Sequence, residues 1–172
     1  DGPTPEKAAT KEHVYSFKGW DKELQPVGNK DITYNAMFSE STRKYTIRFY
    51  DEDGTTLLSE KEVEYGQFPT YTEPTKPSTP EWEYSFASWD PAMTSVTDDA
   101  SYRAKYNATK REYIITFLDN DGTTILSAKN WKYGETPTCS VTDKNITGGT
   151  VIFNRWEPAV TSVTGIATYT AV

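Results

Sequence analysis

Apolar and polar residues alternate along much of this chain, a two-residue period typical of strands that bury one face of a sheet. In one predicted strand Tyr45, Ile47 and Phe49 lie on the same side, separated by polar residues. Leu58 and Val63 differ by an odd step, so both can face the core only if a bulge or a longer loop intervenes. The pattern predicts a mostly β chain, α+β at most, with strands at residues 14–20, 32–38, 45–50, 57–65, 83–89, 101–106, 113–118, 125–133, 151–156 and 168–172.

Two Asp-Gly pairs, Asp53-Gly54 and Asp121-Gly122, predict tight hairpins between neighbouring strands. Their surroundings, DEDGTT and DNDGTT, also suggest calcium loops. The EF-hand pattern, however, places its glycine sixth and a bidentate glutamate twelfth, whereas glycine is fourth here. A hairpin tip demands the same aspartate and glycine, because glycine readily adopts positive φ. We therefore expect turns rather than cation sites at both places.

The alternating pattern itself recurs with a long period. Residues 45–66 return 68 residues later as residues 113–134, with 13 of 22 positions identical. A period of this length is typical of tandem small domains. We expect a partial repeat at 1–44 that holds only a second half, followed by complete repeats at 45–112 and 113–172. Two polar hexapeptides, at residues 39–44 and 107–112, are expected to be linkers that span at most about 20 Å.

The segments after Gly66 and Gly134 are expected to be irregular crossovers. The first is rich in proline and both are poor in helix formers, so a single helical turn near Pro69 is the most we expect. Residues 1–44 lack the first hairpin, which would leave strand edges uncovered. We therefore expect them to pair with the adjoining unit, with a symmetry mate, or in a sheet of their own.

These motifs resemble the Listeria–Bacteroides repeat, the internalin B-type B repeat of bacterial surface proteins. The resemblance rests on YTIRFYDEDGTTLLSEKEVEYGQFPT, followed by YSFASWD and then ASYRAKY. It covers residues 45–172 as two units and residues 14–38 as the second half of another. The family's Gly-Trp-Asp motif keeps its glycine only at Gly19, with Ser88 and Arg155 in its place later.

The resemblance implies tandem small β-grasp (ubiquitin-like) repeats, made of antiparallel hairpins with an irregular or short-helix crossover. It also implies an extracellular location, on the bacterial cell surface or secreted. Its modules act as stalks or in adhesion, so the implied partner is a protein or a glycan on a host or cell surface.

Charge and composition exclude several other classes. The net charge is −7, and residues 45–112 hold 13 acidic against 7 basic residues, which argues against nucleic-acid binding. Part of that excess is the row Glu60, Glu62 and Glu64, for which we expect a solvated strand face, with a cation site as the alternative. The mean hydropathy is −0.72, and no apolar run approaches the roughly 18 residues of a membrane span. No signal peptide is visible, so any export or anchoring signal would lie outside this segment.

The sequence lacks most of the residues that common catalytic sites require. His13 is the sole histidine and Cys139 the sole cysteine, so a catalytic triad, a zinc cluster and an intrachain disulfide are all incomplete. We expect no enzyme, no cofactor and no metal. Tryptophan recurs near the end of one strand in each repeat, at residues 20, 89 and 156, which favours a shared structural role.

Trp82 is the one candidate ligand contact. The other repeats carry His13 and Gly149 at its position, and it stands between two glutamates. It could form an aromatic platform for a sugar, anchor a protein contact, or pack against a neighbouring unit.

The sequence thus predicts a non-catalytic tandem repeat region that acts as a spacer or stalk and as an adhesion or protein-interaction module. The alternative is a carbohydrate-binding module region attached to a glycan-degrading enzyme.

Overall fold

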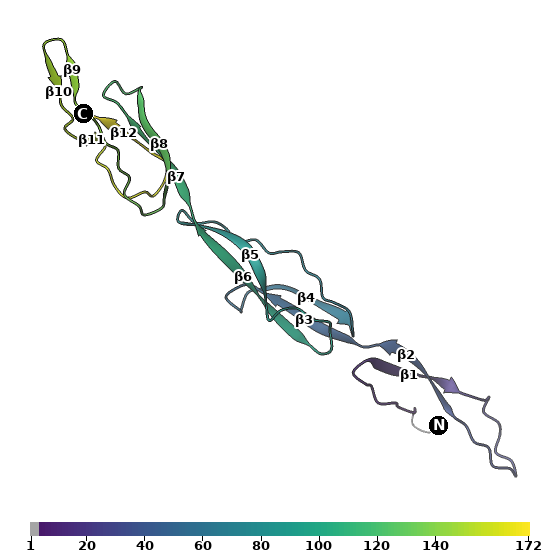
Figure 1. The fold of residues 1–172 in the computed structure, drawn as a ribbon. Helices are drawn as coiled ribbons and strands as arrows, with labels where there is room; N and C mark the ends of the chain where they lie inside the picture. Colours follow the sequence, from purple (N-terminus) through teal and green to yellow (C-terminus); the bar gives the residue numbers. More distant parts are fainter. Residues whose placement is uncertain (1–3) are drawn as a thin grey trace. The chain divides into compact units, whose positions relative to one another are not determined.

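The fold is seen in a computed structural model that describes residues 4–172 (Figure 1). Strands and irregular segments make up this part of the chain, and none of it is helical. The strands are β1 (His13–Trp20), β2 (Ala36–Thr42), β3 (Lys44–Tyr50), β4 (Leu57–Glu64), β5 (Trp82–Asp90), β6 (Ala100–Lys110), β7 (Glu112–Leu118), β8 (Ile125–Lys132), β9 (Lys144–Ile146), β10 (Gly149–Val151), β11 (Trp156–Glu157) and β12 (Ala167–Ala171). Among residues 4–172, no helix has the length and apolar character to cross a membrane.

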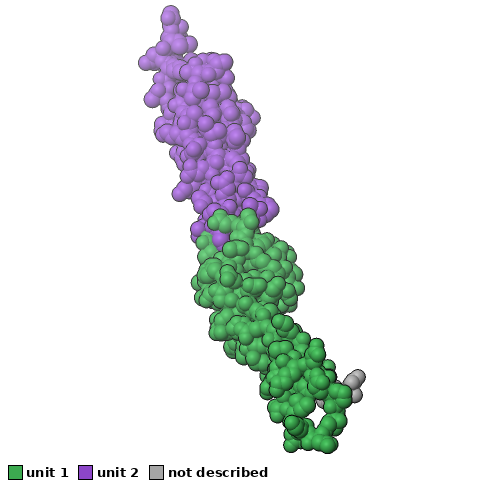
Figure 2. All heavy atoms as spheres, turned by 90° about the vertical axis from the view of Figure 1, so that its right-hand side faces the viewer, with its two compact units in different colours: residues 1–74, 87–105 green, residues 75–86, 106–172 purple. Residues whose placement is uncertain are grey.

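Two mixed four-stranded sheets carry the fold, with strand orders β4-β3-β6-β5 and β11-β12-β7-β8. In each sheet the first strand in sequence lies inside the sheet. It pairs antiparallel with the next strand of the chain and parallel with the sheet's last strand. Two-stranded sheets form from β1 with β2 and from β9 with β10. The chain divides into two compact units, residues 1–74 with 87–105 and residues 75–86 with 106–172 (Figure 2). The domain boundaries expected from the sequence repeat stay a prediction.

The core of unit 1 is built on the alternation seen in the sequence. Tyr45, Ile47 and Phe49 on β3 are 5% exposed or less, as the pattern predicts. The Phe49 ring stacks on Tyr71 of the crossover at 4.8 Å and meets the edge of Trp89, also at 4.8 Å. The irregular crossover therefore covers one face of the sheet, in the place where a helix could have packed.

Unit 2 repeats this arrangement. Ile115 and Phe117 form its core with Val163 and Tyr169. Trp156 meets Phe117 at 4.6 Å, as Trp89 meets Phe49 in unit 1. The shared structural role expected for the recurring tryptophans is thus seen at these two positions.

The Asp-Gly turns adopt the expected conformation, since Gly54 and Gly122 have φ values of 70° and 71°. The register that the sequence left open is settled by a bulge. Ser59 pairs with Phe49 and Leu57 pairs with Tyr50, so Leu58 is the extra residue of a β-bulge. A bulge lets Leu58 and Val63 both turn away from solvent despite their odd spacing.

The prediction that residues 39–44 and 107–112 are linkers is wrong. Strand β2 continues to Thr42 and β6 to Lys110, so most of each hexapeptide is strand. Thr42 pairs with His13 at the end of the β1–β2 ribbon. A two-stranded ribbon is open to water on much of its surface, so its strands can be polar and still keep their ladder. Only Arg43 and Arg111 lie between consecutive strands at these places.

The sequence predicts that the partial repeat pairs with the adjoining unit, with a symmetry mate, or in a sheet of its own. The last of these is confirmed for residues 13–42, because β1 and β2 form a separate two-stranded sheet. The predicted strand at 32–38, however, begins only at Ala36. Asn35 is joined to Asp21, whose N–H donates to the Asn35 carbonyl at 3.0 Å. The Asp21 carboxylate in turn accepts the N–H (2.9 Å) and the side-chain amide (2.8 Å) of Asn35.

The predicted strand at 151–156 is also wrong. An additional hairpin, β9–β10, turns at Gly148 (φ 98°) and ends at Val151, and residues 152–155 form no strand before β11. Asn154 and Arg155 instead pair their backbone groups with Val172 at the end of the chain.

Candidate functional site

Two arginines occupy equivalent one-residue gaps between strands, and each fastens a hairpin to the sheet that follows. In unit 1 the Arg43 N–H donates to the Glu12 carbonyl at 2.7 Å, and its carbonyl accepts the Tyr65 N–H at 2.8 Å. The Arg43 side chain donates through Nη1 to the Thr10 carbonyl at 3.1 Å. Its guanidinium lies 5.1 Å from the centre of the Tyr45 ring. The half-buried Arg43 thus makes two backbone hydrogen bonds, one hydrogen bond from its charged side chain and one stacking contact with a ring.

Unit 2 contains the same arrangement around Arg111. Its N–H donates to the Glu81 carbonyl at 2.9 Å, and its carbonyl accepts the Tyr133 N–H at 2.9 Å. Its Nη1 donates to the Thr79 carbonyl at 3.3 Å, and its guanidinium lies 5.4 Å from the Tyr113 ring centre. We call these two sets the arginine junctions, residues 10–13, 43, 45 and 65 in unit 1 and residues 79–82, 111, 113 and 133 in unit 2.

The tyrosine of each junction also makes a hydrogen bond. The hydroxyl of Tyr45 donates to the Lys11 carbonyl at 2.9 Å, and that of Tyr113 donates to the Pro80 carbonyl at 2.7 Å. Both acceptors belong to the turn that precedes a hairpin strand. The tyrosine is therefore bound to the turn at its hydroxyl and to the arginine at its ring face.

A threonine turn completes each junction. Thr10 Oγ1 accepts the N–H of His13 at 2.9 Å, and Thr79 Oγ1 accepts that of Trp82 at 2.9 Å. Side-chain oxygens of this kind satisfy backbone donors just before a regular element begins. Each turn thereby presents its carbonyls to the arginine and the tyrosine.

Trp82, the candidate ligand contact, is half-buried at the start of β5, where its backbone belongs to the unit 2 junction. The Lys110 ammonium lies 5.6 Å from its ring centre. Tyr84 and Phe86 follow at two-residue intervals and are likewise half-buried, so the three rings share one strand face. Lys76 lies over Tyr84 at 4.1 Å.

The first hairpin has a similar aromatic row. His13, Tyr15 and Phe17 are half-buried on alternate residues of β1, and Lys7 lies over Tyr15 at 3.6 Å. The lysine-covered row is therefore a repeated feature of these hairpins. Tryptophan at its first position is specific to the second hairpin.

The acidic row on β4 faces basic residues of its neighbour. Glu60 forms an ion pair with Arg48 at 2.6 Å, and Glu64 lies opposite Lys44 in the β3–β4 register. Glu62 lies opposite Thr46. Two of the three glutamates therefore lie opposite basic residues, as is common on an exposed sheet face.

The hairpin turns use their aspartates internally. Asp53 Oδ1 accepts the N–H groups of Thr55 and Thr56, both at 2.8 Å, and Asp53 Oδ2 accepts the Thr56 hydroxyl at 2.6 Å. These bonds, the Thr56 hydroxyl foremost, lower the pKa of Asp53 to about 2. The corresponding bonds from Thr124 and Thr123 lower the pKa of Asp121.

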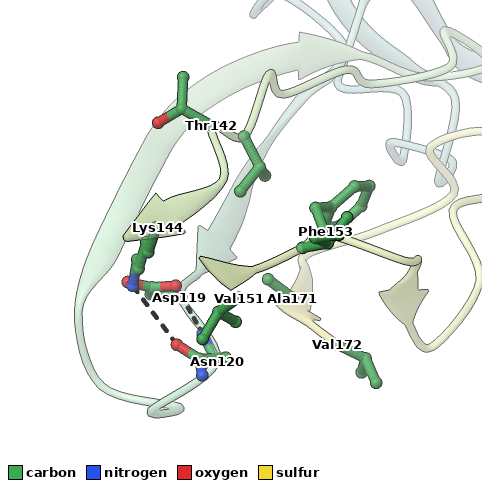
Figure 3. A pocket seen from close by; sticks show the side chains of 10 residues that line it. Asp119, Asn120, Thr142, Lys144, Val151, Phe153, Ala171 and Val172 are labelled. Carbon is green, nitrogen blue, oxygen red and sulfur yellow. Dashed lines mark hydrogen bonds and ion pairs between the residues drawn. The ribbon is translucent and has the colours of Figure 1, made fainter. Parts of the chain in front are cut away.

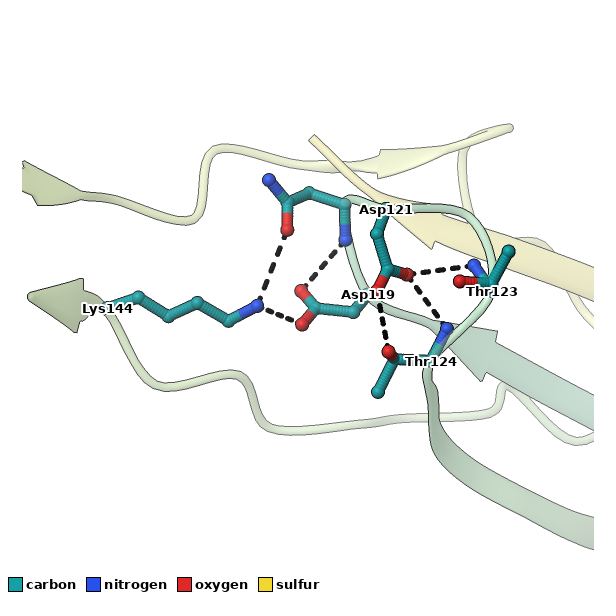
Figure 4. A network of polar contacts seen from close by, with 6 residues as sticks. Asp119, Asp121, Thr123, Thr124 and Lys144 are labelled. Carbon is teal, nitrogen blue, oxygen red and sulfur yellow. Dashed lines mark hydrogen bonds and ion pairs between the residues drawn. The ribbon is translucent and has the colours of Figure 1, made fainter. Parts of the chain in front are cut away.

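Asp119, just before the second turn, is the buried carboxylate of unit 2. Lys144 of the extra hairpin forms an ion pair with it, and the Asn120 N–H donates to it at 2.8 Å (Figure 4). The hydrogen bond from Lys144 is the main reason that the pKa of Asp119 is lowered. A partly open pocket of about 20 Å³ lies at this pair, and apolar residues such as Val151 and Phe153 line it together with Asp119 and Lys144 (Figure 3). Such a cavity has room for about one water molecule and none for a substrate.

The remaining candidate metal-binding and nucleophilic side chains do not gather into a cluster among residues 4–172. Within the described part of the chain, no three His, Cys, Asp or Glu side chains gather as a metal site would require. His13 Nε2 lies 3.2 Å from the Glu40 carboxylate, and Cys139 is a half-buried free thiol.

The comparisons with known proteins give a similarity among solved structures. No family model and no curated protein matches this chain. Among solved structures, it is similar to domains 3–4 of the Streptococcal High Identity Repeats in Tandem (SHIRT) domains from a cell surface protein. The two are 21% identical with a TM-score of 0.38, over 74% of this chain and 95% of that chain. At these values the similarity alone assigns neither a family nor a function.

Proposed function

We propose that this chain is a load-bearing spacer of a bacterial cell-surface or secreted protein, built from tandem β-grasp-like units and without a catalytic role. One observation carries the proposal. In unit 1 the entry strand β3 is paired in parallel with β6, the strand by which the chain leaves the sheet. In unit 2 the entry strand β7 is paired in the same way with β12, near the end of the chain.

This geometry determines how a sheet responds to tension along the chain. A pull on entry and exit strands that lie parallel shears them past one another, so their evenly spaced hydrogen bonds bear the load together. Residues 47–50 face residues 100–103 in one unit, and residues 115–118 face residues 167–170 in the other. A pull on the open end of a hairpin instead breaks its bonds one after another.

The arginine junctions support the same function. A spacer needs its modules joined without a loose linker, and a single residue separates β2 from β3 and β6 from β7. Arg43 and Arg111 each hold that position with two backbone and one side-chain hydrogen bond. Exposed side chains of these modules serve adhesion or protein interaction in addition.

Force spectroscopy on the full chain tests the proposal. With handles at the two chain ends, we expect two unfolding peaks, one for each unit. In a second design the handles are attached at Lys44→Cys and Glu64→Cys, with Cys139→Ser to remove the other thiol. These residues form the first pair of the β3–β4 ladder, so this pull unzips the hairpin and should need a clearly lower force. Equal forces in the two designs, or extension from the ends without a peak, would rule out the load-bearing role.

Carbohydrate binding is the second candidate function, and the aromatic row of β5 favours it. Trp82, Tyr84 and Phe86 share one face, and aromatic rings on a strand face can stack on sugars. The Lys110 and Lys76 ammonium groups over two of these rings argue for packing instead.

Affinity electrophoresis against a broad polysaccharide panel separates these possibilities. If the row binds sugar, at least one polysaccharide should retard the full chain, and Trp82→Ala should abolish the retardation. Trp82→His is the matched control for folding, because the first hairpin carries histidine at this position. Absence of retardation across the panel would end this candidate.

A further inference from the structure

The ribbon of β1 and β2 matches β5 and β6 in sequence, but β2 pairs with β1 alone in the described part of the chain (Figure 1). In each four-stranded sheet, the first four residues of the last strand, 100–103 or 167–170, pair in parallel with the entry strand. The equivalent residues of the ribbon, 32–35, form no strand, and β2 begins only at Ala36. The ribbon therefore has an open edge at the place where the two sheets hold an entry strand.

The aromatic side chains beside this edge show the same difference. In unit 1, Phe49 of the entry strand contacts a tryptophan at 4.8 Å and a tyrosine at 5.5 Å. In unit 2, Phe117 contacts the equivalent pair at 4.6 Å and 5.3 Å. The tyrosine is 4% exposed in both sheets. The matching residues of the ribbon, Trp20 and Tyr34, contact each other with ring centres 6.4 Å apart and are only half-buried.

Val27 shows the difference most clearly, because it is fully exposed. The residues at its position in the two units, Val96 and Val163, are 3% and 2% exposed. Their carbonyls accept the N–H groups of Gly66 and Gly134, both at 2.7 Å. Each glycine follows the hairpin that the entry strand begins. An apolar residue that is buried in two repeats and fully exposed in the third indicates a surface without its partner.

We propose that the ribbon binds the entry hairpin of a further repeat, a hairpin of the kind that β3 forms with β4 and β7 forms with β8. We call Trp20, Val27 and residues 32–36 the receiving surface. The first strand of the bound hairpin pairs in parallel with residues 32–35, and its phenylalanine contacts Trp20 and Tyr34. The glycine that follows the hairpin donates its N–H to the Val27 carbonyl. This is recognition by strand addition, in which backbone bonds give affinity and alternate side chains give specificity.

The chemistry of the receiving surface favours this partner over others. A helix satisfies its own backbone groups and cannot extend a strand ladder. In a second folded copy of this chain, the two entry strands are already paired within their own sheets. The partner is therefore an unpaired hairpin with tyrosine, isoleucine and phenylalanine at alternate positions, as Tyr45, Ile47 and Phe49 stand in β3. The proposal does not depend on the load-bearing role.

NMR titration of the full chain with a synthetic peptide of residues 44–68, up to about 1 mM, tests the proposal. We expect saturable shifts of the Trp20 indole, the Val27 amide and the amides of residues 32–36. At saturation, the amides of residues 33–35 should exchange at least about tenfold more slowly, because they enter a ladder. A control peptide with Phe49→Asp should not bind. Shifts centred on other strands would overturn the proposal, and so would the same shifts on raising the chain concentration alone, which would assign the surface to a second copy.

A matched pair of chain variants identifies the surface. Val27→Asp should leave the free chain folded, because this side chain is fully exposed there, yet it should weaken peptide binding at least about tenfold. Asn29→Asp adds the same charge at an exposed residue nearby and should keep the affinity. Equal affinity of the Val27→Asp chain would refute the proposed contact.

A fused chain separates weak association from the absence of a site. Residues 44–69 are joined ahead of Asp1, so the segment between the added hairpin and the Thr10 turn has the same length as in unit 1. Because the hairpin is now tethered, its effective concentration is high. We expect the amides of Val27 and residues 33–35 to become protected, even where the free peptide binds too weakly to be seen. Absence of protection in the fused chain together with absence of peptide binding would overturn the proposal.

Discussion

Replacement of Phe49 by alanine is expected to unfold the unit 1 sheet and leave the core of unit 2 folded. The Phe49 side chain is fully buried and contacts Tyr71, Trp89 and Tyr102 with ring centres 4.8–5.5 Å apart. Its removal costs about 3–5 kcal/mol, because a cavity of this size cannot close. A single core below about 70–80 residues rarely supplies more than about 3–5 kcal/mol in total, so the loss is comparable to the whole stability of the sheet.

Amide NMR spectra of the full chain measure this effect for each residue. In Phe49→Ala, signals from residues 44–64 should collapse to unfolded positions while those from residues 112–132 keep theirs. Phe117→Ala should give the mirror result, because Phe117 has the same position in the other core. Phe68→Ala is the control, since this side chain is 57% exposed and should change neither set. Collapse of both sets in Phe49→Ala would mean that the two cores unfold as one.

These cores are predictable from sequence, because strict alternation of apolar and polar residues is typical of a strand with one buried face and of little else. The spacing of Tyr45, Ile47 and Phe49 places them on one side, and they are the buried residues of β3. The Asp-Gly turns are equally clear, since few residues other than glycine adopt the positive φ found at Gly54 and Gly122.

The arginine junctions escape prediction for a physical reason. Residues 39–44 and 107–112 are polar, and a polar segment between repeats suggests a linker when composition alone is considered. Strand pairing depends on backbone groups, which composition does not reveal. A signal is present nevertheless, because Thr10, Arg43 and Tyr45 recur as Thr79, Arg111 and Tyr113.

The extra hairpin escapes prediction for a different reason. Its strands, β9 and β10, hold three residues each, and all six residues are exposed. With no buried side in either strand, no alternation of apolar and polar residues can mark them. The ion pair between Lys144 and Asp119 joins residues 25 apart in sequence, so only the folded structure brings it to light.

Loss of the Arg111 side chain is expected to open the junction locally without unfolding the sheet beside it. The guanidinium contributes one hydrogen bond to a carbonyl and one stacking contact to a tyrosine, together about 1.5–2 kcal/mol at a half-buried site. Arg111→Ala should therefore raise the exchange rate of the residue 111 and Trp82 amides by roughly 10- to 30-fold. The core amides of Ile115 and Phe117 should keep their protection.

Hydrogen exchange followed by NMR provides this measurement, and two further variants serve as controls. Arg111→Lys keeps the charge but loses the planar group that stacks on Tyr113, so its effect should be intermediate. Arg155→Ala removes an arginine whose side chain is 58% exposed, and it should leave the junction amides unchanged. Equal loss of protection at junction and core would make Arg111 a general stabiliser of unit 2. No loss at either place would show that the backbone bonds to Glu81 and Tyr133 hold the junction alone, so that the arginine side chain would have no part in fastening the hairpin to the sheet.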